Sequence, residues 1–453
     1  MFSAVRVLVA ASSPILFAAA ALADEKANQS DQPATPLPRY RLQVGQQLDY
    51  EVDESHKSDR GEMRFATELR CLVVGTNQDG SWRIVISERT WRASGKEPIT
   101  RDAQPGRASL EYFDLPADGG DLGDRTVRRI FPRLPDERQQ LAAGWNAEYT
   151  HGTDHYEIES REDGHVRISA VETGPLFDLY QWTFKTSYDF DQPRGLVDRA
   201  VNKSSREARP AFDRMSETRL MGSEILGAEA VSQLADEIRA YVDALNDYRR
   251  QIELAVKDAD RSEMLCAGAK NRLQLAASLL TAPMVKAQAE ATLASHDATT
   301  SRAKRVADRR AKVIGKGVPD FETTDLDGHP FSLKDLRGKV VVLDFWFRAC
   351  EPCIMAMPQI SKVARAFAGK PVAVIGMNTD ENIVDAKYVV EKLRLDYTSV
   401  RAEGSPKEFH VEVFPGLVVV DRNGIVREYH EGAVPTLAAD LSASINALLA
   451  ESK

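Results

Sequence analysis

The sequence has few of the residues on which metal sites and disulfide-rich folds depend. Four cysteines and eight histidines are spread over 453 residues. A structural zinc site needs four ligands, usually two close cysteine pairs or one such pair with two histidines. Only Cys350 and Cys353 are close cysteines, and the only close histidines, His151 and His155, lie on a polar turn. We therefore expect neither a metal site nor a disulfide scaffold.

An excess of positive charge is also missing. The formal net charge is −9, whereas a nucleic-acid-binding domain usually carries a basic surface. The basic run "RAKRVADRRAKVIGK" follows a helical pattern. We interpret it as a solvated helix face, with contact to acidic lipid or a partner surface as the alternative. We expect no nucleic-acid partner and no cofactor.

The N-terminus carries the features of a secretory signal peptide. It contains one basic residue, Arg6, an apolar run over 7–22 broken by Pro14, and an A-L-A sequence ending at Ala23. The run is too short and too interrupted to indicate a membrane span, and no cysteine follows it for lipid attachment. We predict that residues 1–23 are removed on export to the periplasm or another extracytoplasmic compartment. A retained membrane anchor is the alternative.

The two isolated cysteines, Cys71 and Cys266, lie in apolar patterns. We interpret each as a small buried hydrophobe. Oxidising compartments allow stable disulfides, so a bridge between these two residues stays open as an alternative. The sequence alone does not decide their pairing.

Two segments of different character follow the N-terminus. Residues 24–39 are polar and contain several prolines, which predicts a flexible leader. Residues 40–222 mostly alternate between apolar and polar side chains. Three pairs of alternating segments flank the turn sequences "TNQDGS", "EDG" and "DQPR", as is typical of β-hairpins. We predict an all-β antiparallel domain, in which no motif indicates a role.

The apolar spacing changes in residues 226–312. A seam with alternating steps of three and four predicts a helix of about six turns. Its members are Val231, Leu234, Ile238, Tyr241, Leu245, Tyr248 and Ile252. A second helix is expected from an N-cap near Ser262 to a break at 281–283, and an alanine-rich third helix follows. We predict a helical bundle or spacer. A dimerising coiled coil is the alternative, and the oligomeric state stays undecided.

Residues 316–453 indicate an α/β domain. "VVVLDF" is a continuous apolar run, as expected of a strand buried on both faces. A helix from Cys350, a strand in "PVAVIGMN", a helix in "NIVDAKYVVEKL", a hairpin across "RNG" and a final helix come next. This order predicts a mixed sheet covered on both faces. The chain as a whole is therefore predicted to be multidomain, with β, α and α/β parts in that order.

The sequence C-E-P-C follows the buried strand directly. Two cysteines three apart in the first turn of a helix can close a small disulfide, and the helix N-terminus stabilises a thiolate at the first of them. Pro352 suits this turn because its missing N–H would be unpaired there anyway. We predict that Cys350 and Cys353 form a redox centre.

Residues from "VPDFETTDLDGHPFSLKDLRGKVVVLDFWFRACEPC" onward resemble the thioredoxin superfamily. The closer resemblance is to its TlpA/ResA-like extracytoplasmic thiol–disulfide oxidoreductases. Pro319 and Phe321, the "DLDG" turn and "LKDLRGK" match the family's N-terminal hairpin. Pro358 matches the proline that kinks the active-site helix, and Pro415 falls where the family places a cis-proline facing the disulfide. The resemblance implies a thioredoxin-like fold for about residues 316–453.

The resemblance also implies roles for individual residues. Cys350, first and more exposed, would be the nucleophile, and Cys353 would resolve the mixed disulfide. Asp344 matches the family's buried aspartate and is expected to relay a proton, because an acid in "VVVLDFWF" is costly to bury without a purpose. A purely structural carboxylate is the alternative. Glu381 matches an acid near the cysteines, with a loop-tip acid as the alternative, and Trp346 is expected to pack beside the motif.

Three residues depart from the family pattern. Ala349 stands where relatives usually carry tryptophan, and Arg348 precedes it. The cation would favour the thiolate, while the lost ring removes an apolar contact surface. Phe414, just before Pro415, replaces a residue that is often small or β-branched. We expect these positions to affect the redox potential and partner choice.

The expected function is thiol–disulfide exchange with partner-protein cysteines. The resemblance implies a reductant that is itself reduced by a membrane electron-donor protein. The sequence leaves the direction of exchange undecided, with a net oxidant or an isomerase as the alternatives. Two alternatives stay open. A peroxiredoxin is disfavoured because Leu343 and Phe347 occupy the motif's proline and Ser/Thr positions before Cys350. A binding or scaffolding protein would use the thioredoxin-like domain for docking only.

Overall fold

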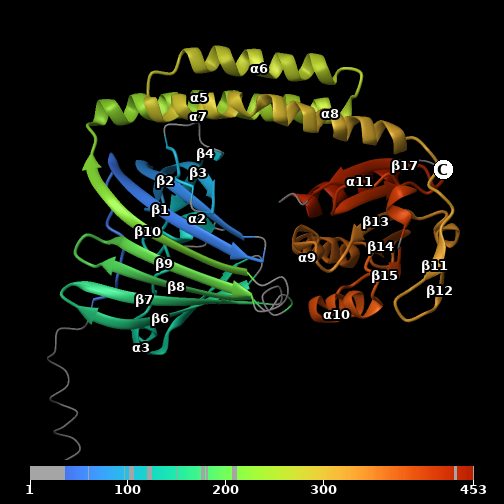
Figure 1. Ribbon diagram of the computed structural model, residues 1–453, viewed down its shortest axis with the longest axis horizontal. Coiled ribbons are helices and arrows are strands. Elements are labelled where there is room, and N and C mark those ends of the chain that lie inside the picture. Colours follow the sequence, from blue (N-terminus) through green and yellow to red (C-terminus); the bar gives the residue numbers. More distant parts are fainter. Residues whose placement is uncertain are drawn as a thin grey trace, which may run out of the picture.

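The computed structural model shows two sheet-containing domains joined by a helical segment (Figure 1). The structure describes residues 36–59, 61–95, 97–101, 107–119, 125–149, 152–174, 179, 182–206, 212–402, 404–432 and 436–451. The expected signal peptide, residues 1–23, and most of the leader lie outside these ranges. Within them, no helix is both long and apolar enough to cross a membrane.

Ten antiparallel strands form the N-terminal sheet. Their bounds are β1 Gln46–Ser58, β2 Gly61–Thr76, β3 Trp82–Ser94, β4 Arg107–Leu115, β5 Trp145–Tyr149, β6 Gly152–Glu162, β7 His165–Thr173, β8 Trp182–Asp191, β9 Leu196–Arg206 and β10 Phe212–Ile225. The strand order is β4-β3-β2-β1-β10-β9-β8-β7-β6-β5. Pairing of β1 with β10 therefore joins two meanders into one sheet. The three hairpins predicted from turn sequences, β2/β3, β6/β7 and β8/β9, are confirmed.

The alternation along these strands separates an apolar face from a charged face. Leu69, Cys71 and Val73 of β2 belong to the main core of the domain, which two short helices, α2 (Arg125–Arg128) and α3 (Gln140–Ala143), border. On the other face, ion pairs link neighbouring strands. The pairs include Arg70–Asp49 at 2.6 Å, Arg199–Glu217 at 2.6 Å and Arg167–Asp189 at 2.8 Å.

Cys71 and Cys266 are both free and buried. Cys71 lies in the sheet core, whereas Cys266 packs with Ala255 and Leu265 in a separate helical cluster. The bridge left open between them is therefore not formed, and their interpretation as small buried hydrophobes is confirmed.

Four helices follow the sheet: α5 Ala228–Lys257, α6 Ser262–Ser278, α7 Pro283–Ala294 and α8 His296–Val313. The structure differs from the expectation in three ways. Helix α5 is longer than six turns, with 30 residues. Ser262 is the first helical residue, and the N-cap is Arg261. The expected third helix is two helices, because the chain turns at Ser295 between α7 and α8.

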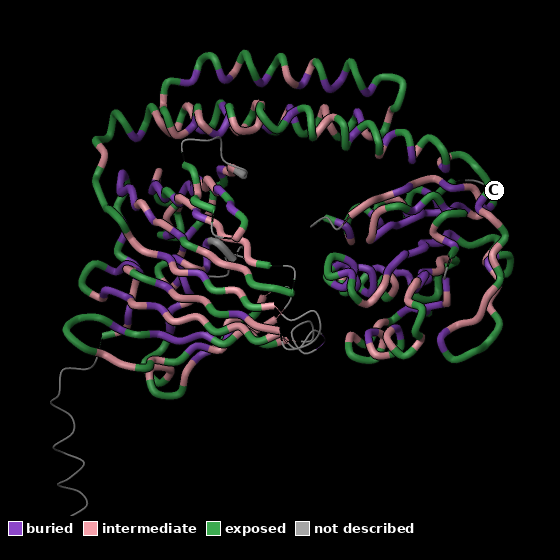
Figure 2. Tube along the Cα trace, viewed as in Figure 1, coloured by how far each residue is buried: buried purple, intermediate pink, exposed green. Residues whose placement is uncertain are grey.

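The seam of α5 is covered within the chain. Ile238, Tyr241, Leu245 and Tyr248 share a cluster with residues of α6 and α7 and with Val85 and Leu110 of the sheet. Figure 2 shows the helical segment lying along the N-terminal sheet domain. The periodicity thus encodes a bundle that packs on the sheet, and no partner chain is needed to bury it.

The helical segment is fixed to both domains. On α7, the Gln288 side-chain amide donates to Ser87 Oγ at 2.8 Å and to the Glu88 carbonyl at 3.1 Å. On α8, Arg309 Nη2 donates to Glu431 Oε2 of the C-terminal domain at 2.7 Å, and both side chains are nearly buried. The helices therefore hold the two sheet domains side by side (Figure 1).

The C-terminal domain contains a five-stranded mixed sheet. Its strands are β13 Val340–Trp346, β14 Val372–Asn378, β15 Thr398–Arg401, β16 Gly416–Val420 and β17 Val426–Glu431, and its helices are α9 Glu351–Ala366, α10 Ile383–Leu393 and α11 Leu437–Ala450. The strand order is β15-β14-β13-β16-β17, with β13, β14 and β15 parallel and the other pairings antiparallel. A small hairpin of β11 (Glu322–Thr324) and β12 (Pro330–Ser332) precedes the sheet.

One strand of the C-terminal sheet was not predicted. β15 has only four residues at the edge of the sheet, so its sequence "TSVR" is too short to show a period. Helices α9 and α11 cover the sheet face that carries Val340, Val342 and Val419. The opposite face packs against other segments, including the end of α8 at Val313.

Candidate redox site

The two cysteines of C-E-P-C lie between β13 and α9, at the N-terminus of that helix. They form a disulfide, with Cα atoms 5.3 Å apart. Cys350 is the N-cap of α9, and Pro352 lies in its first turn. The Cys353 N–H donates to Cys350 Sγ at 3.2 Å. In the reduced protein this N–H and the helix dipole would both stabilise a thiolate on Cys350.

Both cysteines are buried. Cys350 is 6% exposed and Cys353 is 1% exposed. Cys350 is thus the more exposed of the two, as predicted, but only slightly. The two belong to an apolar cluster with Trp346, Ile354 and Met357. The predicted packing of Trp346 beside the motif is confirmed.

Asp344 is a fully buried acid in β13. Successive side chains of a strand point to opposite faces of the sheet. Asp344 therefore shares a face with Val342 and Trp346, which both pack against α9. The Tyr397 hydroxyl donates to Asp344 Oδ2 at 3.0 Å, while Asp344 Oδ1 has no partner among the described residues. Burial raises the pKa of Asp344 to about 7, although the hydrogen bond from Tyr397 lowers it.

Tyr397 was missed by sequence reasoning. It lies 53 residues from Asp344, just before the unpredicted strand β15, so no local pattern connects the two. Gly376 lies opposite Asp344 in the sheet. A Cβ added there would lie 2.4 Å from Ser399 Oγ and 2.9 Å from Trp346 Nε1, so this position requires glycine. The polar face near Asp344 therefore has no room for a side chain on β14.

Two acids, Asp380 and Glu381, follow β14. Glu381 is exposed. Its neighbour Asp380 is half-buried, and its Oδ2 accepts hydrogen bonds from the Arg348 N–H at 2.9 Å and the Asn378 side-chain amide at 2.8 Å. Asp380 therefore fixes the loop that leads into Cys350. Burial raises the pKa of Asp380.

The positive charge of Arg348 is directed toward α10. Its guanidinium pairs with Asp385 and lies 4.6 Å from the centre of the Tyr388 ring. The charge is therefore partly compensated, which weakens the thiolate stabilisation expected from this cation.

Phe414 packs against the cluster that contains the cysteines, and Pro415 follows it. The peptide bond between them is cis, as the resemblance implied. The Phe414 ring packs edge-to-face on Phe347 with ring centres 5.2 Å apart, and both rings pack against the cluster that contains the cysteines. The departures at 348, 349 and 414 are thus all near the redox centre.

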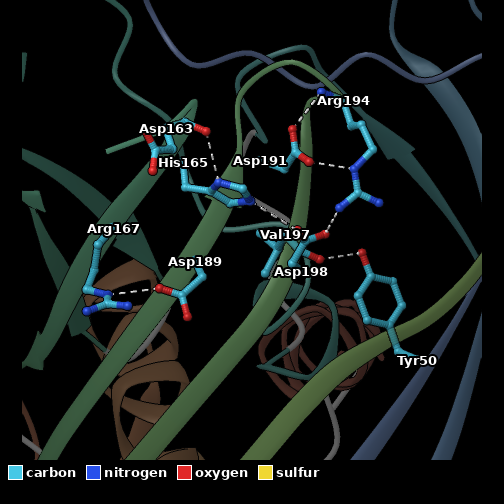
Figure 3. A network of polar contacts seen from close by, with 9 residues as sticks. All are labelled: Tyr50, Asp163, His165, Arg167, Asp189, Asp191, Arg194, Val197 and Asp198. Carbon is cyan, nitrogen blue, oxygen red and sulfur yellow. Dashed lines mark hydrogen bonds and ion pairs between the residues drawn. The ribbon is translucent and has the colours of Figure 1, made fainter. Parts of the chain in front are cut away.

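A second cluster of polar side chains lies in the N-terminal domain (Figure 3). His165, Asp191 and Asp198 offer possible ligand atoms within 4.8 Å of one another. Arg194, however, donates to both carboxylates, with Nε 2.5 Å from Asp191 Oδ2. A cation would have to displace this guanidinium, so we assign no metal site here. Of the histidine pair discussed above, His151 lies outside the described residues.

The fold and the C-x-x-C disulfide define a thioredoxin-like oxidoreductase domain. The model of a family described as AhpC/TSA matches residues 314–429. ResA, a thiol–disulfide oxidoreductase of Bacillus cereus, is 33% identical over 124 residues, which are 27% of this chain and 72% of ResA. ResA of Geobacillus kaustophilus is 30% identical over 129 residues, covering 28% of this chain and 74% of that protein. The chain belongs to this family of thiol–disulfide oxidoreductases.

Two solved structures are also similar to a part of the chain. A secreted disulfide oxidoreductase of Mycobacterium tuberculosis is 27% identical, with a TM-score of 0.26, and the match covers 28% of this chain and 96% of that one. The thioredoxin domain of a thiol–disulfide oxidoreductase of Bacteroides vulgatus is 26% identical, with a TM-score of 0.28, covering 30% and 99%.

Proposed function

We propose that this protein is an extracytoplasmic oxidoreductase that reduces disulfides of partner proteins through Cys350 and Cys353. The observation that carries the proposal is the placement of the pair: Cys350 caps α9, and the Cys353 N–H donates to its sulfur. An anionic sulfur at this position is stabilised without a metal or cofactor.

The exchange proceeds in two displacements. The Cys350 thiolate attacks one sulfur of a partner disulfide, a mixed disulfide forms, and the other partner sulfur leaves as a thiolate that takes a proton. Cys353 then loses its proton and attacks Cys350 Sγ, which releases the second partner thiolate. Two electrons pass to the partner, and the Cys350–Cys353 disulfide is restored.

Asp344 is the proposed acceptor of the Cys353 proton. Its position on the face of β13 that packs against α9 supports this role, as does a pKa of about 7. A carboxyl with that pKa can both accept and release a proton near neutral pH. Glu381 is exposed, so we place the proton transfer at Asp344 and leave Glu381 as an unsupported candidate.

The proposal also includes an extracytoplasmic compartment and a source of electrons. The sequence of residues 1–23 supports export, and an oxidising compartment would return the pair to its disulfide form unless a donor reduces it. A membrane electron-donor protein is the proposed source. We propose reduction as the net direction because the resemblance to the ResA-like branch implies it; the names of the relatives support thiol–disulfide exchange in either direction.

The test uses Cys353→Ala. This variant keeps the Cys350 nucleophile and removes the resolving thiol, so it should hold partner proteins as stable mixed disulfides, visible as reducible adducts on non-reducing gels. Cys350→Ala is the matched control and should trap none. The wild type should also reduce insulin with dithiothreitol as donor, and its potential against glutathione gives the direction of exchange. No adduct together with no insulin reduction would leave the docking or scaffold function.

Peroxide reduction is the less favoured candidate despite the AhpC/TSA match. The positions that would carry the motif's proline and Ser/Thr are Leu343 and Phe347. Leu343 is buried in the sheet core, and Phe347 packs on Phe414. Neither offers a polar group to a peroxide near Cys350.

A further inference from the structure

One residue of the N-terminal domain lies at the redox centre. Leu179, from the connection between β7 and β8, is 2% exposed and belongs to the apolar cluster that contains Cys350 and Cys353. The other buried members of this cluster come from the C-terminal domain. Leu179 precedes Cys350 by 171 positions in the sequence, so this contact joins the two domains.

The helical segment explains how the contact is maintained. Helix α7 is bonded to the sheet through Gln288, and α8 is bonded to the C-terminal domain through the nearly buried pair Arg309–Glu431. The main chain continues this attachment, because Gly315 N donates to the Val426 carbonyl at 2.8 Å. Strand ends of the N-terminal sheet consequently face α9 and α10 (Figure 1). The helices thus hold the N-terminal domain in the position in which Leu179 reaches this apolar cluster.

Access to Cys350 decides the rate of exchange. A partner sulfur must approach Cys350 Sγ in line with the disulfide that breaks. Cys350 is only 6% exposed while Leu179 occupies the cluster. Among the exposed residues of α9 and α10 are two apolar ones, Met355 at 36% and Val384 at 63%.

We propose that the N-terminal domain caps its own redox centre with Leu179, and that a partner must displace this side chain to react. The partner that fits is a protein with an apolar residue beside the reacting cysteine, because such a residue can replace Leu179 in the cluster. With this cap, the N-terminal β domain takes part in partner selection. The role of the partner rests on the proposed function.

Alkylation of the reduced full-length protein tests the cap without needing a partner. The rate at which a bulky polyethylene-glycol maleimide modifies Cys350 is followed by mass spectrometry of its peptide, with iodoacetamide as a small reference reagent. Leu179→Ala removes apolar area from the cap, so this rate should rise roughly tenfold, equivalent to about 1.4 kcal/mol. If Leu179→Ala lowers the yield of folded protein, Leu179→Thr serves instead, because it retains more volume but adds a hydroxyl that disfavours the apolar cluster.

Two control variants separate the cap from general effects. Leu179→Met keeps apolar volume and should stay within about twofold of the wild-type rate. Leu279→Ala changes a leucine that is 75% exposed, beyond the end of α6, and should leave the rate unchanged. An unchanged rate in Leu179→Ala overturns the cap even if insulin is reduced normally. A raised rate without any insulin reduction supports the cap and refutes the proposed function alone.

Discussion

Replacing Asp344 by asparagine should make the stability of the redox domain less dependent on pH. Burial raises the pKa of Asp344 from 3.8 to about 7 in the folded protein. Between these values the folded protein holds a proton that the unfolded chain has released. The folded state therefore binds more protons, and the free energy of unfolding falls as pH rises through this window. Asparagine carries no ionisable proton and removes this contribution.

The magnitude follows from the two pKa values. Each unit of difference corresponds to about 1.36 kcal/mol. Integrating the proton binding lowers the free energy of unfolding, relative to the protein with Asp344 protonated, by about 2 kcal/mol at pH 5 and about 4 kcal/mol at pH 8. The advantage of Asp344→Asn over the wild type should therefore grow by roughly 2 to 3 kcal/mol between these two pH values. The quantity to measure is how the stability difference between variant and wild type changes with pH. A poor hydrogen bond of the new amide would shift this difference by the same amount at every pH.

Hydrogen exchange read by mass spectrometry is the suitable assay. Exchange of the β13 amides reports the opening free energy of the redox domain without interference from the other domain. The wild type and Asp344→Asn would be compared at several pH values, each against its own unfolded reference. Insulin reduction on the same samples should be slower in Asp344→Asn, most clearly above about pH 7, where the carboxylate would act as base.

Asp421→Asn is a control of opposite sign in the same domain. Burial raises the pKa of Asp421, but hydrogen bonds from the Ile425 N–H, the Arg427 side chain and the Asn423 N–H outweigh it and lower the pKa overall. Its contribution to stability is present above the unfolded pKa and is lost as pH falls, so Asp421→Asn should be more harmful at high pH. A difference between Asp344→Asn and wild type that does not change with pH would refute the assignment of a near-neutral pKa to Asp344.

Two further variants test the neighbours of the site. Tyr397→Phe removes the hydroxyl whose hydrogen bond lowers the pKa of Asp344; the pH window of the Asp344 effect should move upward in the same exchange experiment, and a downward shift would contradict this account. Arg309→Gln leaves the Glu431 carboxylate, 3% exposed, without its cation, which should destabilise the attachment of α8 by about 3 kcal/mol. Faster exchange in β17 would register this loss. Arg365→Gln is the control: it breaks the exposed pair with Asp396 in the same domain and should cost about 1 kcal/mol or less.

Local patterns in the sequence predicted most of the elements. Period-two alternation and turn residues located the hairpins of the sheet, and the seam of α5 was recognised from its steps of three and four. The same local rules failed where an element is short or a helix bends: β15 has four residues, and α7 and α8 were read as one helix because both are rich in alanine.

The sequence by itself determined the redox centre, because a disulfide between Cys350 and Cys353 and its helix N-terminus need only neighbouring residues. Only the tertiary structure decided the environment of that centre. It brought the Tyr397 hydroxyl into a hydrogen bond with Asp344 and the Asp380 carboxylate into a hydrogen bond with the Arg348 N–H, on the loop before Cys350. It also brought Leu179 into the cluster around the disulfide. Burial and access depend on contacts between residues far apart in the chain, and these contacts set the pKa of Asp344 and the exposure of Cys350.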